Sequence, residues 1–172
     1  YELTEKSIDS SCLLKTIAQF RCSSQIPDNL NGVCAVILPC ENDFSHLNLP
    51  QDTFVLSDIP RGVLHNGDRI VNQLKLAKQY GVKAAICHNL AAFNYAKQAE
   101  LPAIAGFGMN VYNSDSVTAV KNLGALATTV SFEADIKDAV ALGGNLPKGV
   151  SSYGRVPLML FRNCPHNNRD GC

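Results

Sequence analysis

Short apolar runs alternate with polar or amphipathic segments along most of this chain. Runs rich in Val, Ile, Ala and Phe, bounded by Gly, Pro, Asn and Asp, predict β-strands. The predicted strands are 15–21, 33–39, 53–57, 83–88, 103–109, 126–132 and 149–153, with 157–162 as a candidate eighth strand.

Between the later strands, apolar residues recur at helical spacing. Asparagine, serine or aspartate precedes these segments and glycine often follows them, as is typical of helix caps. The predicted helices run from Asn66 or Asp68 to Gly81, over 89–98, from Asn113 or Ser114 to Gly124, and over 133–142.

The spacing of the later strands indicates a repeated strand–helix unit. Strands starting at 83, 103, 126 and 149 lie 20, 23 and 23 residues apart, and such units build parallel sheets with right-handed crossovers. Between 15 and 58 the strands are joined by loops rich in Pro, Asn and Asp. The pattern predicts an α/β fold, a small or incomplete TIM-type barrel with about 7–8 mainly parallel strands and 4–5 helices; an open doubly wound sheet is the alternative.

Composition narrows the class of protein. The 172 residues suit one domain, and because the chain starts without Met and ends on Cys172, we expect 1–172 to be a single domain of a longer protein. Fifteen basic and fifteen acidic residues give zero net charge, which offers no case for a wide nucleic-acid surface. No apolar run is long enough to span a membrane. Seven cysteines, an odd number, several of them in apolar runs, favour the reducing cytoplasm.

Polar side chains gather at the carboxyl ends of the predicted strands, where parallel barrels place their functional residues. Carboxylate, imidazole, guanidinium and amide groups together can bind a polar or anionic ligand and transfer a proton. The residues at these ends are Asp58, Arg61, His88, Asn89, Asn110, Asn113, Ser131, Glu133, Tyr153 and Arg155. We expect five of them to bind substrate: Arg61, Asn89, Asn110, Asn113 and Tyr153.

Local structure offers a second explanation for these polar residues. Asparagine is common at helix caps and in turns, which suits Asn89, Asn110 and Asn113. Glu133 would lie in the first turn of the last predicted helix, where a carboxylate complements the helix dipole.

The remaining polar residues also have a structural alternative. His88 could be a hydrogen-bonded structural histidine, and Asp58 could pair with Arg61 at the surface. The combination of these groups at one edge points to function more strongly than any single residue does.

Two cysteines close the chain. Cys164 and Cys172 bracket the polar segment PHNNRDG, which can fold back to bring two thiolates onto one metal or cluster; free thiols are the alternative. Because two cysteines cannot complete a four-thiolate iron–sulfur site, further ligands would come from Cys12, Cys22, Cys40 or a longer chain.

Five runs in this order resemble the collagenase-like peptidase family, bacterial peptidases of unknown catalytic type. The runs are SDIPRG (57–62), CHNLAA (87–92), GFGMNVYNSDS (106–116), TTVSFEAD (128–135) and SSYGRVPLMLFRNCP (151–165). The chain is most similar to the partial, C-terminal copy of the family domain in long clostridial-type members. The resemblance implies a barrel-like cytoplasmic enzyme, with Asn110, Asn113, Glu133 and Arg155 in its pocket and Cys164 as a cluster ligand.

The resemblance implies two competing activities. One is peptide hydrolysis, with Glu133 as general base or metal ligand, His88 as second ligand or acid, and Arg155 holding a substrate carboxylate. The other is iron–sulfur-dependent hydroxylation of transfer or ribosomal RNA, or of a small precursor. The segment Gly154-Arg155-Val156-Pro157 stands where the cysteine-rich branch has one of its cysteines. A third hypothesis is a non-catalytic barrel that docks the remainder of a longer polypeptide.

Overall fold

The computed structural model describes residues 15–63, 66–157 and 159–160. Its frame is one sheet of seven parallel strands, in which each strand pairs with the next in sequence. The strands are β1 (Thr16–Gln19), β2 (Val33–Pro39), β3 (Phe54–Asp58), β4 (Ala84–Cys87), β5 (Ala103–Ala105), β6 (Ala125–Thr129) and β7 (Lys148–Gly149). This curled half-barrel confirms the predicted incomplete TIM-type α/β fold and excludes the doubly wound order.

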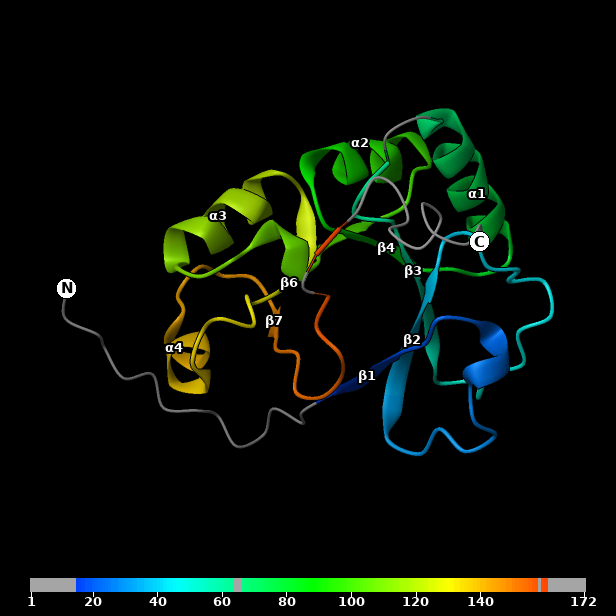
Figure 1. The fold of residues 1–172 in the computed structure, drawn as a ribbon, viewed down its shortest axis with the longest axis horizontal. Coiled ribbons are helices and arrows are strands. Elements are labelled where there is room, and N and C mark those ends of the chain that lie inside the picture. Colours follow the sequence, from blue (N-terminus) through cyan, green and yellow to red (C-terminus); the bar gives the residue numbers. More distant parts are fainter. Residues whose placement is uncertain (1–14, 64–65, 158, 161–172) are drawn as a thin grey trace, which may run out of the picture.

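Four α-helices connect the later strands of the described chain. They are α1 (Gly67–Gln79), α2 (Leu90–Gln98), α3 (Ser114–Asn122) and α4 (Ile136–Ala141), and two 3-10 turns, η1 (Ser23–Gln25) and η2 (Phe107–Met109), are added. Figure 1 shows the helices in an arc around the strands, with the blue and cyan loops of residues 20–53 on the side that the arc leaves open. Within the described residues, no helix is both long and apolar enough to cross a membrane.

Two predicted elements are shorter than the sequence pattern indicates. The strand expected over 103–109 ends at Ala105, because the chain turns into η2, where the Met109 N–H donates to the Gly106 carbonyl oxygen. The helix expected over 133–142 begins only at Ile136. Backbone hydrogen bonds close a turn before it, with the Ala134 N–H donating to the Ser131 carbonyl oxygen, so Glu133 does not lie in the first helical turn.

The last strand is also corrected. Of the strand expected over 149–153, only Gly149 lies in β7. The Val130 N–H still donates to the Gly149 carbonyl oxygen at the end of this ladder, while on the other edge of the same strand the Ser131 N–H donates to the Val111 carbonyl oxygen. Among residues 157–162, the three that the structure describes (157, 159 and 160) form no strand.

The two faces of the sheet have different cover. Along β4, Ala85 and Cys87 point into the main core under the helices, whereas Ala84 and Ile86 belong to a small cluster on the inner, concave face, as the alternation of a strand requires. The inner cluster also contains Ala35 and Leu56. Because Phe54, Leu56 and Asp58 alternate along β3, they share the inner face with their register partners on β2 and β4.

Candidate active site

An aspartate–histidine pair lies at the carboxyl edge of β3 and β4. Asp58 is the last residue of β3, and His88 directly follows β4. The His88 Nε2 atom lies 2.8 Å from Asp58 Oδ1. The side chain of His88 is 5% exposed and that of Asp58 is 18% exposed, so the carboxylate is the more accessible member of the pair.

The second carboxylate oxygen of Asp58 also has a partner. The Gln19 side-chain amide, at the end of β1, donates to Asp58 Oδ2 at 3.0 Å. Gln19 reaches Asp58 across β2, since the sheet order is β1-β2-β3, and this is possible because the sheet is curled. The carboxylate carried by β3 is thus fixed by one side chain from β1 and by one that follows β4, all on the inner face.

An aromatic ring packs against the histidine, and a cation packs on that ring. The Phe107 ring, in η2, lies 4.6 Å from the His88 ring, and the Phe132 ring lies 6.0 Å from that of Phe107. The Arg61 guanidinium carbon lies 5.2 Å from the centre of the Phe107 ring, a cation–π distance. Asn89 holds the Arg61 backbone, because its Nδ2 donates to the Arg61 carbonyl oxygen at 2.8 Å. The predicted substrate-binding residue Arg61 therefore packs on the ring that packs on His88.

Asp58 and Arg61 do not pair with each other, although the sequence allowed this alternative. The carboxylate hydrogen-bonds to His88 and Gln19, and the guanidinium lies over Phe107. Within the described residues, Arg61 has no carboxylate within ion-pair distance. An exposed guanidinium on the same edge of the sheet as a fixed carboxylate can bind an anionic group of a substrate.

The asparagines expected to bind substrate have local structural roles. The Asn89 Oδ1 accepts from the Ala92 N–H and caps α2. Asn113 caps α3 in a reciprocal capping box with Ser116. Asn110 ends η2 in the left-handed conformation, with a φ of 51°, which asparagine tolerates better than most residues.

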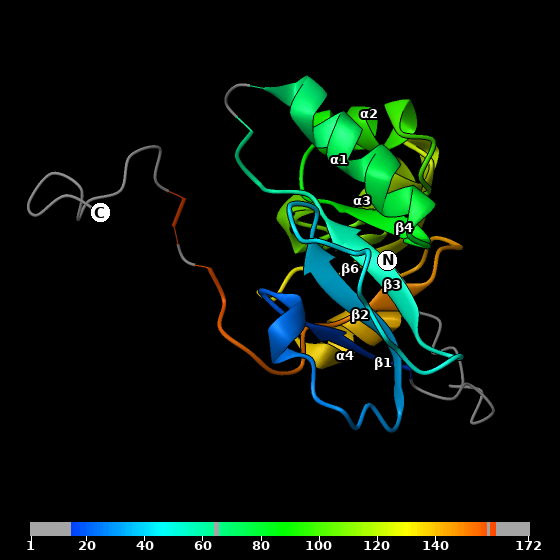
Figure 2. The same cartoon turned by 90° about the vertical axis from the view of Figure 1, so that its right-hand side faces the viewer.

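The structure does not bring three other predicted site residues to the pair: the catalytic candidates Glu133 and Arg155, and the substrate-binding candidate Tyr153. Glu133 is exposed, and its N–H lies 3.4 Å from Ser131 Oγ. Tyr153 is fully exposed and Arg155 is exposed. Their segment, orange to red in Figure 2, leaves the body of the sheet. Within the described residues, none of these three side chains makes a hydrogen bond or ion pair with Asp58 or His88.

The cysteines predicted as cluster ligands, Cys164 and Cys172, lie outside the described residues. Burial raises the pKa of Cys40 to about 12, with the negative charges of Glu41 and Asp58 adding to the shift. Burial, with a contribution from Asp58, also raises the pKa of Cys87 to about 12. In residues 15–63, 66–157 and 159–160, no three His, Cys, Asp or Glu side chains are grouped to hold a metal ion. The described part therefore offers no set that fits an iron–sulfur cluster or a divalent metal.

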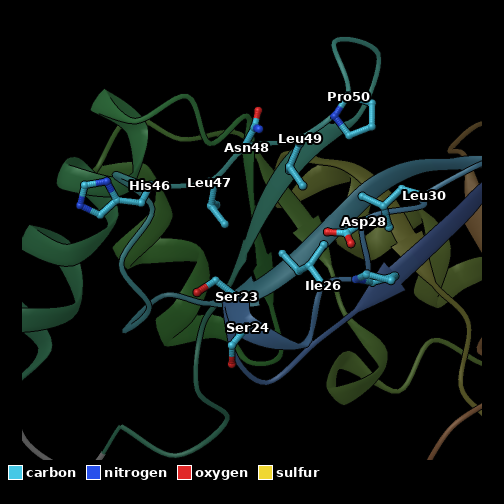
Figure 3. Close-up of a pocket in the computed structure, with 11 residues that line it drawn as sticks. Ser23, Ser24, Ile26, Asp28, Leu30, His46, Leu47, Asn48, Leu49 and Pro50 are labelled. Carbon is cyan, nitrogen blue, oxygen red and sulfur yellow. The ribbon is translucent and has the colours of Figure 1, made fainter.

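A separate hollow of about 520 Å³ lies between the loops that flank β2. Figure 3 shows side chains from residues 23–30 on one side and from residues 46–50 on the other. Neither Asp58 nor His88 lines this hollow. Its position in the outer loop layer separates it from the pair on the inner face, so the candidate chemistry does not depend on it.

No protein-family model matches this sequence, and no curated protein matches it either. The class that the fold defines is thus an α/β protein with an incomplete parallel barrel. The collagenase-like assignment and the iron–sulfur alternative stay predictions from the sequence.

Sequence reasoning overlooked two residues of this site. Gln19 is the last residue of β1 and shares a face with Ile17. Its place at the carboxyl end of a parallel strand, where barrels put functional residues, is the signal that could have found it. Phe107 lies between two glycines, and no pattern in the sequence indicates that its ring covers a histidine 19 positions earlier.

Proposed function

We propose that this chain is the domain of a peptide hydrolase that uses Asp58 as the proton acceptor. The observation that carries the proposal is the fixed carboxylate at the carboxyl edge, with His88 at 2.8 Å and Gln19 at 3.0 Å. Each carboxylate oxygen has more than one lone pair, so Asp58 can accept a further hydrogen bond from a water molecule. A carboxylate fixed at the working edge of a parallel barrel is suited to general base chemistry.

The proposed reaction is hydrolysis of an amide bond. Asp58 takes one proton from water while the water oxygen forms a bond to the carbonyl carbon. That proton passes to the leaving nitrogen as the carbon–nitrogen bond breaks, which returns Asp58 to its ionised form. His88 and Gln19 hold the carboxylate, and Arg61 binds a carboxylate of the peptide.

The position of Glu133 supports Asp58 over the base that the sequence favours. Glu133 is exposed and, within the described part of the chain, makes no hydrogen bond or ion pair with Asp58 or His88, whereas Asp58 is largely shielded and held at both oxygens. A positioned general base contributes roughly 100-fold or more to a reaction rate. Replacing each carboxylate by its amide therefore shows which of the two is the general base.

The test is cleavage of gelatin and of unstructured peptides by the full chain and three variants. We expect Asp58→Asn to lower kcat/KM about 100-fold, and Glu133→Gln to leave it unchanged. Asp43→Asn is the matched control, because among the described residues the partner of the Asp43 carboxylate is Ser45 in its own loop. No cleavage by the wild-type chain, or full cleavage by Asp58→Asn, overturns the proposal.

The exposed inner face supports a second candidate, a barrel segment that docks the remainder of a longer polypeptide. Parallel sheets are normally covered on both faces, but Ile17 and Phe54, on the inner face, are 51% and 54% exposed. In this case, Ile17→Lys combined with Phe54→Lys would weaken binding of the remaining polypeptide, while Asp58→Asn would not. Equal binding by the double variant would exclude the docking role.

A further inference from the structure

We infer that Gly106 and Gly108 are positioning residues that hold His88 as an Nε2–H donor toward Asp58. The inference concerns how the pair is built, and its catalytic consequence rests on the proposed function. It assigns the two glycines of the GFG run, for which the sequence pattern indicates no role, to the orientation and protonation pattern of a single histidine.

The first observation is steric. A Cβ atom at Gly106 would lie 2.4 Å from His88 Cε1 and 2.5 Å from His88 Nδ1, closer than non-bonded atoms approach. The φ angle of Gly106 is −77°, which any residue can adopt. The same Cβ atom would lie 2.8 Å from Ile86 Cγ2. Space for the imidazole and for Ile86, and not backbone freedom, therefore requires glycine at this position.

Gly108 approaches the same histidine from its backbone side. A Cβ atom here would lie 2.8 Å from both the Cβ atom and the carbonyl oxygen of His88. The backbone bonds of η2 keep both glycines in place: the Gly106 N–H donates to the Cys87 carbonyl oxygen at 2.8 Å, and the Met109 N–H donates to the Gly106 carbonyl oxygen at 3.0 Å. The turn is thus fixed to the end of β4, directly beside the ring.

The second observation is electronic. The Gly108 N–H donates to His88 Nδ1 at 3.3 Å, and a nitrogen that accepts this bond carries no proton. In the neutral ring the proton then lies on Nε2, which faces Asp58 Oδ1 at 2.8 Å. Both ring nitrogens are therefore engaged, and Phe107 covers the ring at 4.6 Å. Hence His88 donates a hydrogen bond, and the group with remaining acceptor capacity is Asp58.

This arrangement assigns separate roles to the two members of the pair. If His88 were the base, it would have to release the Gly108 N–H before taking a proton on Nδ1. Because η2 is hydrogen-bonded to β4, that release requires the turn to move. The glycines thus favour Asp58 as the proton acceptor and hold His88 as its orienting partner.

The experiment reads the tautomer directly. The full chain is labelled with ¹⁵N-histidine, its ring nitrogens are observed by NMR at about pH 8, where an unperturbed histidine is neutral, and the His88 signals are assigned by their loss in His88→Gln. We expect the wild-type ring to carry its proton on Nε2. A proton on Nδ1, or an even mixture of tautomers, in the wild-type chain overturns the inference without the need for any folded variant.

Glycine variants then test the positioning role. Gly108→Ala and Gly106→Ala should each broaden or mix the His88 tautomer signals and lower kcat/KM roughly tenfold, with KM changed little. Gly149→Ala is the control, because its nearest atom would be the Thr128 carbonyl oxygen at 4.0 Å, and it should match wild type. Wild-type tautomer signals in both folded glycine variants would overturn the inference.

The two proposals fail in different ways. If the tautomer and its response to the glycine variants are as expected but Asp58→Asn cleaves peptides normally, the proposed hydrolase function fails and the geometry of the pair stands. If Asp58→Asn abolishes cleavage but the wild-type ring carries its proton on Nδ1, the positioning inference fails and the hydrolase function stands.

Discussion

The sheet is covered in two different ways along its length. In the helix-backed region, residues 67–141, helices α1, α2 and α3 pack on the outer face through buried residues such as Leu74 and Val117. In the loop-backed region, residues 15–58, the loops on either side of β2 supply Leu30 and Phe44 to the same core. A parallel sheet needs apolar cover on its face, and irregular loops can provide it where helices are absent.

The candidate site joins these two regions. Asp58 ends the last strand of the loop-backed region, and His88 follows the first strand of the helix-backed region. Gln19 comes from the far edge of the loop-backed region. The geometry of the pair therefore depends on both regions, and a difference in rigidity between the loops and the helices should affect the site.

The largest expected effect is on the alkylation rate of two buried thiols, which should be far lower in the folded chain than in the unfolded chain. Cys40 follows β2 in the loop-backed region and Cys87 ends β4 in the helix-backed region, and burial raises the pKa of both to about 12. At about pH 8 their thiolate fraction is then roughly one in ten thousand, so iodoacetamide should label them roughly 1000-fold more slowly than free cysteine. Peptide mass mapping over time measures this.

The labelling rates of Cys40 and Cys87 also report the relative rigidity of the two regions. We expect Cys40 to label faster than Cys87, because loops open locally more often than helices packed on a sheet. Equal rates in the native chain, with both rising together in urea, would contradict a difference in rigidity between the two regions.

Replacing one buried leucine by alanine in each region should lower the free energy of unfolding by different amounts. Leu74, in α1, is fully buried, and Leu30, in a loop, is nearly so. We expect Leu74→Ala to cost about 4 kcal/mol and Leu30→Ala about 2 kcal/mol, since a loop can partly fill the cavity that the missing side chain leaves. Urea unfolding gives both values, and Leu76→Ala is the control because Leu76 is half exposed in α1. A larger loss at Leu30 would refute this order.

A buried hydroxyl lies at the boundary of the two regions. Ser57, on the outer face of β3, is fully buried, and its Oγ has no hydrogen-bond partner among the described residues. Its register partners Leu38 and Ala85 are apolar. Because a buried polar group without a partner destabilises the fold, Ser57→Ala should stabilise the chain by about 1 kcal/mol.

The matched control for Ser57 is Ser131. Its side chain is also buried, but its Oγ accepts from the Glu133 N–H at 3.4 Å, so Ser131→Ala should destabilise slightly, by about 0.5 kcal/mol. Thermal unfolding of both variants measures whether each substitution raises or lowers the stability of the chain. A loss of stability in Ser57→Ala would mean that the hydroxyl has a partner in the folded chain.

The smallest effect should come from a surface ion pair in the helix-backed region. Lys78 Nζ lies 3.0 Å from Glu100 Oε2, and this hydrogen bond and the lysine charge lower the pKa of Glu100 below its ordinary value of 4.5. A lowered folded pKa stabilises the chain above the unfolded pKa, and this contribution is lost as the pH falls through the folded value. Because Glu100 is exposed, Glu100→Gln should change the melting temperature near neutral pH hardly at all. The small difference from wild type should shrink as the pH falls below 4.5 and vanish once the pH lies below the lowered pKa of the folded chain. A clear loss of stability that persists in acid would contradict the ion-pair explanation.

The amino-acid pattern alone determined the class of the fold and most of its elements. Strands β2, β3 and β4 and helices α1, α2 and α3 lie where apolar periodicity predicts them, because burial of an apolar face is a local property of a sequence. Asn89 and Asn113 cap α2 and α3 as predicted, whereas Asn66 before α1 makes no side-chain cap hydrogen bond. The same logic placed Asp58, Arg61 and His88 at one edge of the sheet. It failed over 103–109 and 133–142, where turns within the apolar runs end or delay the elements.

Only the tertiary structure decided which of the polar residues meet. The sequence permitted Asp58 to pair with Arg61, but the curl of the sheet brings it to His88 and to Gln19, two strands away. It also left Glu133 outside that group and brought Gly106 and Gly108 against the imidazole. The physical reason is that strand register and sheet curvature set distances between residues remote in sequence, whereas periodicity reports only which face a residue occupies.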